Sequence, residues 1–225
     1  MPHREAVILA ARDLTIVPQL HARLDEMDIA TCTADLPDLS EGPHYWCFVD
    51  WLLPDISGIE ICRRLRETPA TRYAHITMVL DDDDNEIKKR ALKSGADDYL
   101  LGPLDADRLA LRLHQYRRSQ GTTPPAARLK SGDLHIDLSA VLVRYGDSRI
   151  SLAPNEFRLL AHFIENPDRV YSRTSLIEVL GKDDSSIDER TVDVWVGRLR
   201  RALKSQGVPD NLRTVRAMGY VFDSL

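Results

Sequence analysis

The chain has 225 residues, of which 43% are hydrophobic and 29% charged, and its formal net charge is −5. This length is enough for about two domains with cores of their own. No apolar run approaches the ~18 residues of a membrane span, and residues 1–5 lack signal-peptide character, so we expect a cytoplasmic protein. Cys32, Cys47 and Cys62 are odd in number and have no CxxC spacing, which argues against a disulfide framework or a zinc site.

The charge is unevenly distributed along the chain. Residues 1–118 carry 15 Lys/Arg against 21 Asp/Glu, a balance of −6, whereas residues 119–225 carry 15 against 14, a balance of +1. Within residues 190–216, seven basic residues face only two acidic ones, a local balance of +5. Such a cluster in an otherwise acidic protein predicts contact with a polyanion.

Up to residue 118, short apolar runs alternate with segments of helical spacing. The expected strands are residues 6–10, 45–49 and 76–80, and the expected helices are residues 17–27, 58–67, 86–94 and 105–118. This alternation is typical of βαβ units and predicts an α/β fold with a doubly wound parallel sheet. Functional groups gather at the carboxyl ends of the strands in such sheets. Asp50 directly follows one of the expected strands.

Residues 119–126 contain a Pro-Pro pair and no apolar periodicity, which is typical of an interdomain linker. Beyond it the order of elements changes. We expect strands at residues 134–138, 141–145 and 149–152, helices at residues 155–166, 173–180 and 187–204, and a hairpin at residues 213–222. This order predicts a second, α+β domain over residues 127–225.

The last expected helix divides into two faces. Its core side is apolar, with Val192, Val196, Leu199 and Leu203, and its opposite side is rich in arginine. Arginine suits bidentate contacts with guanine or phosphate, and an exposed valine can meet a thymine methyl group. An ordinary solvated face would intersperse Glu and Lys. The candidate DNA-binding residues are Arg190, Thr191, Val194, Trp195, Arg198, Arg200 and Arg201 in the helix, with Thr214 and Arg216 in the hairpin.

Two of these residues have specific expected roles. Trp195 lies at the edge of the apolar stripe, so we expect it to be half-packed, with its indole N–H directed to a DNA phosphate. Arg216 precedes Gly219 and Tyr220 in the hairpin, where it would enter a narrow minor groove.

Residues 188–203, DERTVDVWVGRLRRAL, resemble the recognition helix of the OmpR/PhoB family of response regulators, and residues 213–222 resemble that family's wing. Residues 154–160 and 170–173 resemble the rest of its winged helix-turn-helix, and residues 47–58 resemble the phosphoacceptor strand and loop of its receiver domain. The resemblance implies a flavodoxin-like receiver at residues 1–118, a linker at 119–126 and a winged helix-turn-helix domain at 127–225. It also implies a transcriptional regulator rather than an enzyme. Its partners would be a direct-repeat operator in double-stranded DNA, a second copy of the chain, RNA polymerase and, in the conventional case, a histidine kinase.

The surroundings of Asp50 depart from the family pattern. The acidic pair that chelates Mg²⁺ is replaced by Ala11 and Arg12, the residue with a hydroxyl group by Leu80, the small residue beside it by Asp81, and the lysine by Gly102. Asp50 and the aromatic switch position, Tyr99, are kept. Mg²⁺ needs several hard oxygen ligands, and phosphoryl transfer needs cations that neutralise the developing charge. We therefore expect no metal ion, no cofactor and no appreciable phosphorylation of Asp50, with Arg12 beside Asp50 in place of an ion.

The acidic run Asp81–Asp84 has two interpretations. It is either a relocated cation site or a solvated loop that places negative charge at the start of the next helix. We favour the loop, because four consecutive residues rarely face one ion and acidic residues stabilise a helix N-terminus.

The family pairs its receivers through a surface that corresponds to residues 86–116 of this chain. Its apolar centre is expected to consist of Ile87, Ala91, Leu92 and Ala110, with the Asp98–Arg112 pair at the rim.

Three functions stay open at this point. The first is a DNA-binding regulator whose receiver serves as a phosphorylation-independent dimerisation module. The second is a conventional response regulator phosphorylated on Asp50 by a histidine kinase. The third is an interaction protein whose acidic domain binds another protein and whose basic domain touches DNA incidentally, with salt-sensitive binding and no sequence preference.

Overall fold

A computed structural model describes residues 5–24, 27–39, 44–121, 128–138, 141–180 and 189–224. The chain divides into two compact units, residues 1–118 and residues 119–225. Among the described residues, no helix combines the length and the apolar character that crossing a membrane requires.

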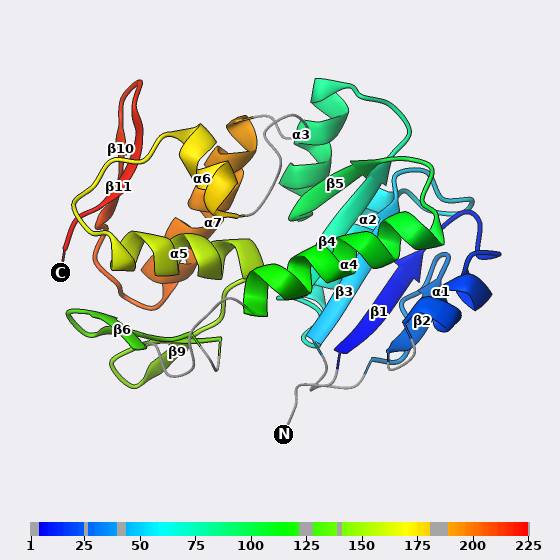
Figure 1. The fold of residues 1–225 in the computed structure, drawn as a ribbon, viewed down its shortest axis with the longest axis horizontal. Coiled ribbons are helices and arrows are strands. Elements are labelled where there is room, and N and C mark those ends of the chain that lie inside the picture. Colours follow the sequence, from blue (N-terminus) through cyan, green and yellow to red (C-terminus); the bar gives the residue numbers. More distant parts are fainter. Residues whose placement is uncertain are drawn as a thin grey trace. The chain divides into compact units, whose positions relative to one another are not determined.

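The first unit is a five-stranded parallel sheet in the order β2-β1-β3-β4-β5, with helices between the strands (Figure 1). The strands are β1 (Glu5–Ala10), β2 (Asp28–Cys32), β3 (His44–Asp50), β4 (His75–Leu80) and β5 (Asp98–Leu101). The helices are α1 (Val17–Arg23), α2 (Gly58–Glu67), α3 (Asn85–Ser94) and α4 (Ala106–Gly121). This arrangement confirms the doubly wound parallel sheet that the sequence predicts.

Helices cover both faces of this sheet. α1 and α4 pack on one face, where Leu20 and Leu109 meet Val7, Leu9 and Phe48. On the other face α2 and α3 contact each other, with α2 against β3 and α3 against β4 and β5. Because apolar residues face helices on both sides, the central strands are apolar without alternation, as buried parallel strands are.

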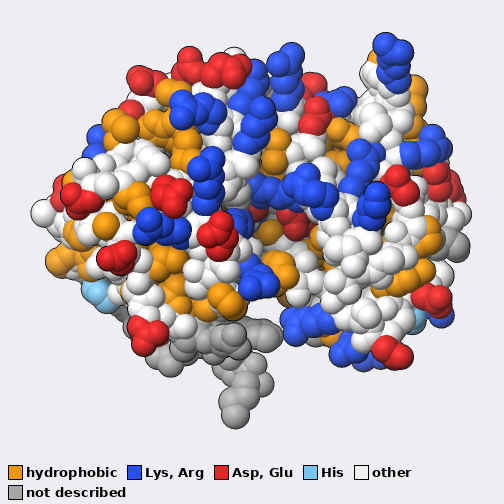
Figure 2. All heavy atoms as spheres, turned by 180° about the vertical axis from the view of Figure 1, so that it is seen from behind, with side chains coloured by type: hydrophobic (Ala, Val, Ile, Leu, Met, Phe, Trp, Pro, Cys, Tyr) orange, Lys and Arg blue, Asp and Glu red, His pale blue; other side chains and the backbone are white. Residues whose placement is uncertain are grey.

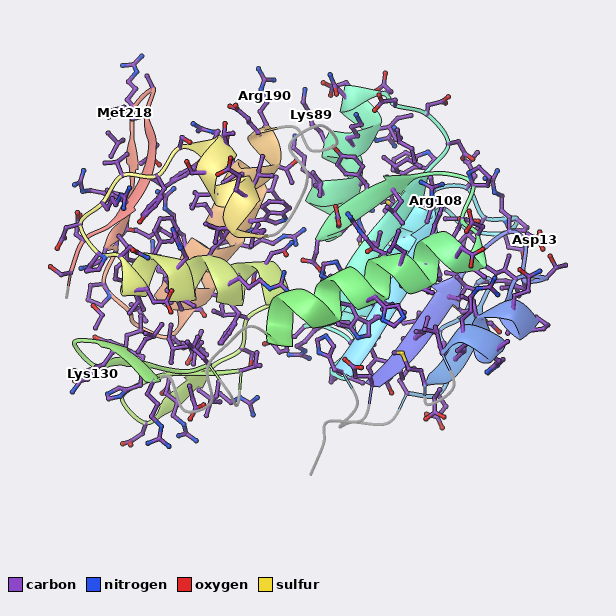
Figure 3. The ribbon with its side chains drawn as sticks, in the orientation of Figure 1. Asp13, Lys89, Arg108, Lys130, Arg190 and Met218 are labelled. Atoms are coloured by element: carbon purple, nitrogen blue, oxygen red, sulfur yellow. The ribbon has the colours of Figure 1, made fainter. Side chains whose placement is uncertain are left out.

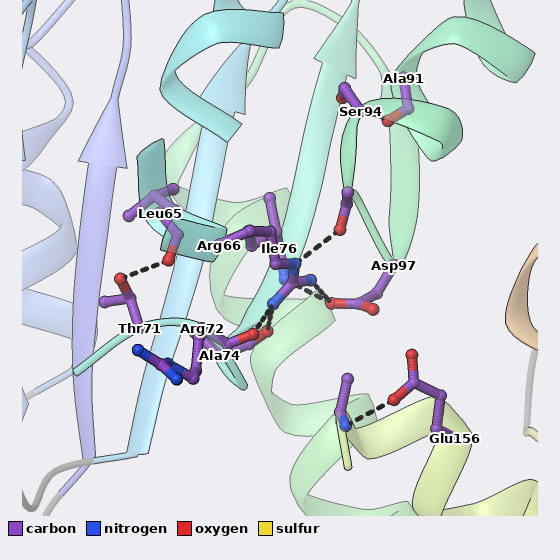
Figure 4. A network of polar contacts seen from close by, with 12 residues as sticks. Leu65, Arg66, Thr71, Arg72, Ala74, Ile76, Ala91, Ser94, Asp97 and Glu156 are labelled. Carbon is purple, nitrogen blue, oxygen red and sulfur yellow. Dashed lines mark hydrogen bonds and ion pairs between the residues drawn. The ribbon is translucent and has the colours of Figure 1, made fainter. Parts of the chain in front are cut away.

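A buried ion pair holds the end of the sheet that lies away from Asp50 (Figure 4). The guanidinium of Arg66, at the end of α2, lies 2.6 Å from Asp97 Oδ2 and also donates to the carbonyls of Ala74 and Gly95. Asp97 is fully buried and also accepts the backbone N–H of Ile76. Burial of a charge is tolerated only with such complete pairing. The pair therefore joins α2 to the starts of β4 and β5.

The second unit is α+β. A four-stranded antiparallel sheet comprises β6 (Arg128–Ser131), β7 (Leu134–Asp137), β8 (Leu142–Tyr145) and β9 (Ser148–Ile150). Three helices follow, α5 (Pro154–Glu165), α6 (Arg173–Val179) and α7 (Arg190–Ser205), and then the hairpin of β10 (Leu212–Val215) and β11 (Gly219–Phe222). α5 lies at the centre of the packing, in contact with β6, α6, α7 and β11.

Several element limits differ from the sequence prediction. β2, β5 and β6 were not predicted, because all three lie at sheet edges and are short or mixed in polarity. α1 ends at Arg23, four residues earlier than expected. α4 extends to Gly121, so the first three residues of the predicted linker are helical, and residues 122–126 lie outside the described part of the chain. Residues 187 and 188, expected at the start of α7, also lie outside it.

Candidate functional site

The carboxyl ends of the parallel strands bring the predicted pocket residues together. Asp50 ends β3, Leu80 ends β4, and Gly102 follows β5 with its N–H donating to the Leu80 carbonyl at 2.7 Å. The start of α2 is pressed against the same point, because a Cβ atom on Gly58 would lie 2.1 Å from the Asp50 carbonyl oxygen. Only glycine permits this approach. Asp50 is 7% exposed in consequence.

Arg12 occupies the space beside Asp50. Its backbone N–H donates to Asp50 Oδ2 at 2.8 Å, and its Nε lies 3.7 Å from the same oxygen. Its Nη2 pairs with Asp81 Oδ1. One guanidinium thus serves two carboxylates, and the pairing of Arg12 with Asp50 that the sequence predicts is found in the structure.

The protonation of Asp50 reflects opposing influences. Burial raises the pKa of Asp50, while the N–H and the charge of Arg12 oppose the rise and the nearby Asp81 adds to it. The hydrogen bond to Asp81 raises the pKa of Arg12, so the guanidinium stays charged. Arg12 is therefore the side chain that opposes the rise in the pKa of Asp50.

The remaining acidic residue of the first loop does not join this group. The carboxylate of Asp13 accepts the backbone N–H of Thr15 at 2.8 Å, and Figure 3 places Asp13 at the outer edge of the first unit. Among the described residues, no group of three or more acidic, histidine or cysteine side chains is arranged to hold a metal ion. With Arg12 between Asp50 and Asp81, the side chains of this edge do not fit Mg²⁺.

Leu80 and Gly102 change the pocket in shape as well as in chemistry. Leu80 is fully buried and has no hydroxyl group to offer. A Cβ atom at Gly102 would lie 3.2 Å from the Leu80 carbonyl oxygen and 3.3 Å from Val79 Cγ1. A lysine at this position would therefore require its neighbours to shift.

Two acids of the run Asp81–Asp84 have partners in or beside α3. Asp84 caps α3, its carboxylate accepting the N–H groups of Glu86 and Ile87 at 2.7 and 3.0 Å. Asp83 pairs with Lys88. This is the solvated loop and helix N-terminus favoured by the sequence.

The predicted pairing surface of the receiver needs correction. Ala91, Leu92 and Ala110 are buried within the unit, at 0%, 2% and 8% exposure, because they pack beneath α3 and α4. They cannot form the centre of a contact with a second copy. Asp98 is 1% exposed and pairs with Arg112 within the same chain. Of the proposed apolar centre only Ile87 is half-exposed.

The apolar side chains that this surface does expose are different ones. Leu101, at the end of β5, is 37% exposed and Leu111, on α4, is 59% exposed. Leu111 follows the buried Ala110 by one position, which is a turn of about 100° around the helix, so the two side chains point in different directions.

In the second unit, the outward side of α7 carries Arg190, Val194, Arg198 and Arg201, whereas Val192 and Val196 are fully buried. Gly197 lies among the outward residues and has open space around it. In Figure 3, Arg190 at the start of α7 and Met218 in the hairpin turn point out of the same end of the unit.

Two predicted DNA contacts are wrong. Trp195 is fully buried and belongs to the core cluster, and Thr191 is 2% exposed. Both α5 and α6 pack against α7, so its buried stripe is wider than that of a helix docked on one side. The indole of Trp195 therefore packs in the core and does not reach DNA.

Arg200 and Thr214 connect α7 to the hairpin. Arg200 Nε donates to the Leu212 carbonyl at 2.6 Å, and its Nη2 donates to Thr214 Oγ1 at 2.9 Å. These bonds hold the first strand of the hairpin along the helix. Arg200 thus has a positioning role that its place beside the basic face does not reveal.

A second connection, which sequence reasoning missed, is centred on Asp193. Its Oδ1 accepts the Tyr220 hydroxyl at 2.6 Å and lies 2.7 Å from Arg173 Nε. The guanidiniums of Arg173 and Arg200 lie over the Tyr220 ring at 5.2 and 5.4 Å. Burial and Asp193 raise the pKa of Tyr220 to about 12, so it remains a donor. The sequence feature that could have indicated this connection is Asp193 itself, an acidic residue on an otherwise basic helix face.

The hairpin turn projects beyond these connections. Arg216 and Met218 are exposed there, Met218 at 61%, and the Met218 N–H donates to the Val215 carbonyl at 3.0 Å. Figure 2 shows basic side chains at the tip of this hairpin. The helix face and the turn form one basic surface whose two parts are held together by Arg200 and Asp193.

Comparisons with known proteins agree with both units. Residues 16–114 match the family described as response regulator receiver domain, and residues 147–222 match the family described as transcriptional regulatory protein, C terminal. The chain is 39% identical over 189 residues to the phosphate regulon transcriptional regulatory protein PhoB of Rhizobium meliloti, covering 84% of this chain and 80% of that protein. It is 35% identical over 177 residues to the PhoB protein of Pseudomonas aeruginosa, covering 78% and 76%. Among solved structures, a cysteine-to-aspartate mutant of RitR shares the fold, with a TM-score of 0.62, 20% identity and coverage of 98% and 100%.

Replacing Arg12 by alanine should raise the pKa of Asp50 further. The substitution removes a guanidinium that lowers this pKa and leaves Asp81 without its partner nearby, while the backbone N–H to Asp50 is kept. A carboxyl-carbon NMR titration of Asp50 measures the change, and Arg12→Lys, which keeps the positive charge, is the control with a smaller expected shift. An Asp50 titration unaltered by Arg12→Ala would show that the guanidinium does not act on this carboxylate.

Proposed function

We propose the following function for this chain, which belongs to the OmpR/PhoB family of DNA-binding response regulators: it is a transcriptional regulator whose receiver acts without phosphorylation. The observation that carries the proposal is the guanidinium of Arg12, which stands between Asp50 and Asp81. Phosphoryl transfer to a carboxylate requires cations and donors that are free to meet the developing charge. At this edge of the sheet the available cation is already paired with two acids.

The neighbouring residues support the same conclusion. A phosphoryl group on Asp50 would lie near the carboxylate of Asp81, with no hydroxyl at Leu80 and no cationic side chain at Gly102. Two adjacent anions without a metal ion repel each other strongly at a partly buried site. Asp50 then serves as a structural acceptor for the N–H and guanidinium of Arg12.

For the second domain, we propose that α7 enters the major groove and the hairpin turn follows the adjacent minor groove of a direct-repeat operator. The outward arginines Arg190, Arg198 and Arg201 support base and phosphate contacts. Arg216 at the turn suits a narrow minor groove. Arg200 and Thr214 contribute by positioning the hairpin. RNA polymerase is the further partner that a transcriptional regulator of this kind engages.

One winged domain reads a short half-site, so useful specificity requires two copies. We propose that the receiver supplies this pairing constitutively through the surface of α3, β5 and α4. Leu101 and Leu111, which are exposed, and the half-exposed Ile87 are the apolar side chains it offers.

The alternative is a conventional response regulator that a histidine kinase phosphorylates on Asp50. The exposure of the Arg12 side chain, 46%, favours it, because a side chain at the surface can swing away from Asp50. The two functions differ in what a phosphodonor does to Asp50.

Asp50→Ala should leave affinity for the operator nearly unchanged, because Asp50 carries no phosphate in the proposed active form. Incubation of the unsubstituted protein with acetyl phosphate and Mg²⁺ should add no stable phosphate mass. Intact-protein mass spectrometry and an operator titration make the two measurements. A phosphate mass that disappears in Asp50→Ala would establish the conventional alternative.

Arg198→Ala and Arg201→Ala should each weaken operator binding by about 1–3 kcal/mol if these side chains meet bases. Arg216→Ala should weaken binding most on operators with A·T-rich flanks. Fluorescence anisotropy with operator and scrambled duplexes measures both, and the exposed Arg72→Ala in the first unit is the control. Loss of affinity that is equal for operator and scrambled duplex would indicate incidental contact with phosphates only.

The full-length protein should form a concentration-dependent dimer without Mg²⁺ or a phosphodonor, since the proposed pairing needs no phosphate. Leu111→Asp and Ile87→Asp should shift it to monomer by placing a charge in the apolar part of the contact. Leu52→Asp is a matched control, because Leu52 is 52% exposed and lies after β3, outside the proposed surface. Sedimentation velocity makes the measurement. A dimer that survives both substitutions would assign pairing to another surface.

A further inference from the structure

The outer face of the β6–β9 sheet carries a row of four basic side chains. The strand register places Lys130 opposite His135, His135 opposite Arg144, and Arg144 opposite Arg149. All four are exposed. Directly paired residues of an antiparallel sheet point to the same side, so the four form one line across the sheet. At a strand spacing of about 4.8 Å, the line is about 14 Å long.

The neighbouring row establishes which face is which. Leu129, Ile136, Val143 and Ile150 are likewise in register, and they belong to the hydrophobic core of the unit or pack against it. Side chains alternate between the two faces of a sheet. The basic row therefore lies on the solvent side.

Like charges directly opposite one another destabilise a sheet, and the register places Arg144 directly opposite Arg149. Among the described residues, the side chains of its four members make no hydrogen bond or ion pair. The one acid within the strands of this face, Asp137, pairs with Arg128 at 3.3 Å. Asp133 and Asp147 lie in the turns at one end. The three cations of the row, Lys130, Arg144 and Arg149, have no ion-pair partner among the described residues and therefore suit an anionic partner.

We propose that this row, Lys130–His135–Arg144–Arg149, is a second DNA-binding surface that contacts the phosphates of a duplex other than the one read by α7. α5 packs between the sheet and α7. In Figure 3, Lys130 points out of the unit at the end opposite to Arg190 and Met218. The row and the surface of α7 and the hairpin turn therefore face different ends of the unit.

The character of the face favours nucleic acid over an acidic protein. Within the strands, its one apolar side chain is the half-buried Leu142. Protein interfaces bury an apolar or aromatic centre, and this face offers none. Phosphate contacts need only cations, and they carry no sequence information. The surface therefore holds a second duplex irrespective of its sequence, and the protein bridges two DNA segments.

A two-duplex capture experiment tests the proposal with the full chain. Operator duplex is immobilised, protein is added, and a labelled duplex of unrelated sequence is then captured at a series of salt concentrations. The unsubstituted protein should retain the second duplex. The variant Lys130→Gln/Arg144→Gln/Arg149→Gln should lose it while binding the operator as before. The slope of log capture constant against log salt should fall by about one unit for each cation removed in the single variants.

The controls separate the row from net charge and from folding. Arg63→Gln/Arg72→Gln/Lys93→Gln removes three charges from exposed positions of the first unit and should still bridge. The charge-conserving Lys130→Arg/Arg144→Lys/Arg149→Lys should also bridge. Operator binding in the first step reports the proposed function independently of the second duplex.

Three results would overturn the proposal. The first is a triple glutamine variant that captures the second duplex like the unsubstituted protein, which would assign bridging to the α7 surfaces of a dimer. The second is a triple glutamine variant that loses binding to the operator and to the second duplex equally, while the charge-conserving variant binds both. This result would show that the row contacts the operator itself. The third is absence of bridging by the unsubstituted protein, which would leave the row to an acidic protein partner.

Discussion

The chemistry of the first domain depends on how one guanidinium is shared between two carboxylates. A parallel sheet brings the carboxyl ends of its strands to one edge, so acids that follow different strands come close together. In this chain Asp50 and Asp81 meet there, and Arg12 lies between them. A divalent ion at such an edge can leave or exchange, whereas a side chain stays covalently attached to the chain beside the carboxylate that it pairs with. The proposed independence from phosphorylation follows from this difference.

The residues packed around Asp50 leave little free space beside it. Gly58 lets α2 close on Asp50, and Gly102 lies too close to Leu80 and Val79 for a larger residue to fit without movement. Leu80 is buried at the position where the family pattern has a residue with a hydroxyl group, and its side chain is apolar. The Arg66–Asp97 pair, in contrast, is remote from this edge and serves stability. Arg12, Leu80, Asp81 and Gly102 thus lie together at this edge, on a parallel sheet of the receiver type.

In the second domain, polar contacts hold the reading surface in one geometry. Asp193 receives Tyr220 and Arg173, and Arg200 binds the first strand of the hairpin. Charge-assisted bonds of this kind are stronger than neutral ones and restrict orientation. Helix and turn can therefore approach DNA as one preformed surface, which lowers the entropy lost on binding. Two residues on or beside the basic face, Asp193 and Arg200, form hydrogen bonds with residues of the hairpin.

The amino-acid sequence was sufficient to predict the two fold classes, the order of the main elements and the division of α7 into an apolar and a basic side. These are local properties, since strand runs, helical periodicity and motif spacing are visible along the chain. Burial that depends on packing from several directions could be seen only in the folded domains. Trp195 and Thr191 are buried because two helices cover α7, and Ala91, Leu92 and Ala110 are buried because α3 and α4 press them onto the sheet. The row on the β6–β9 sheet likewise requires strand register, which aligns Lys130, His135, Arg144 and Arg149 although 19 positions separate the first from the last.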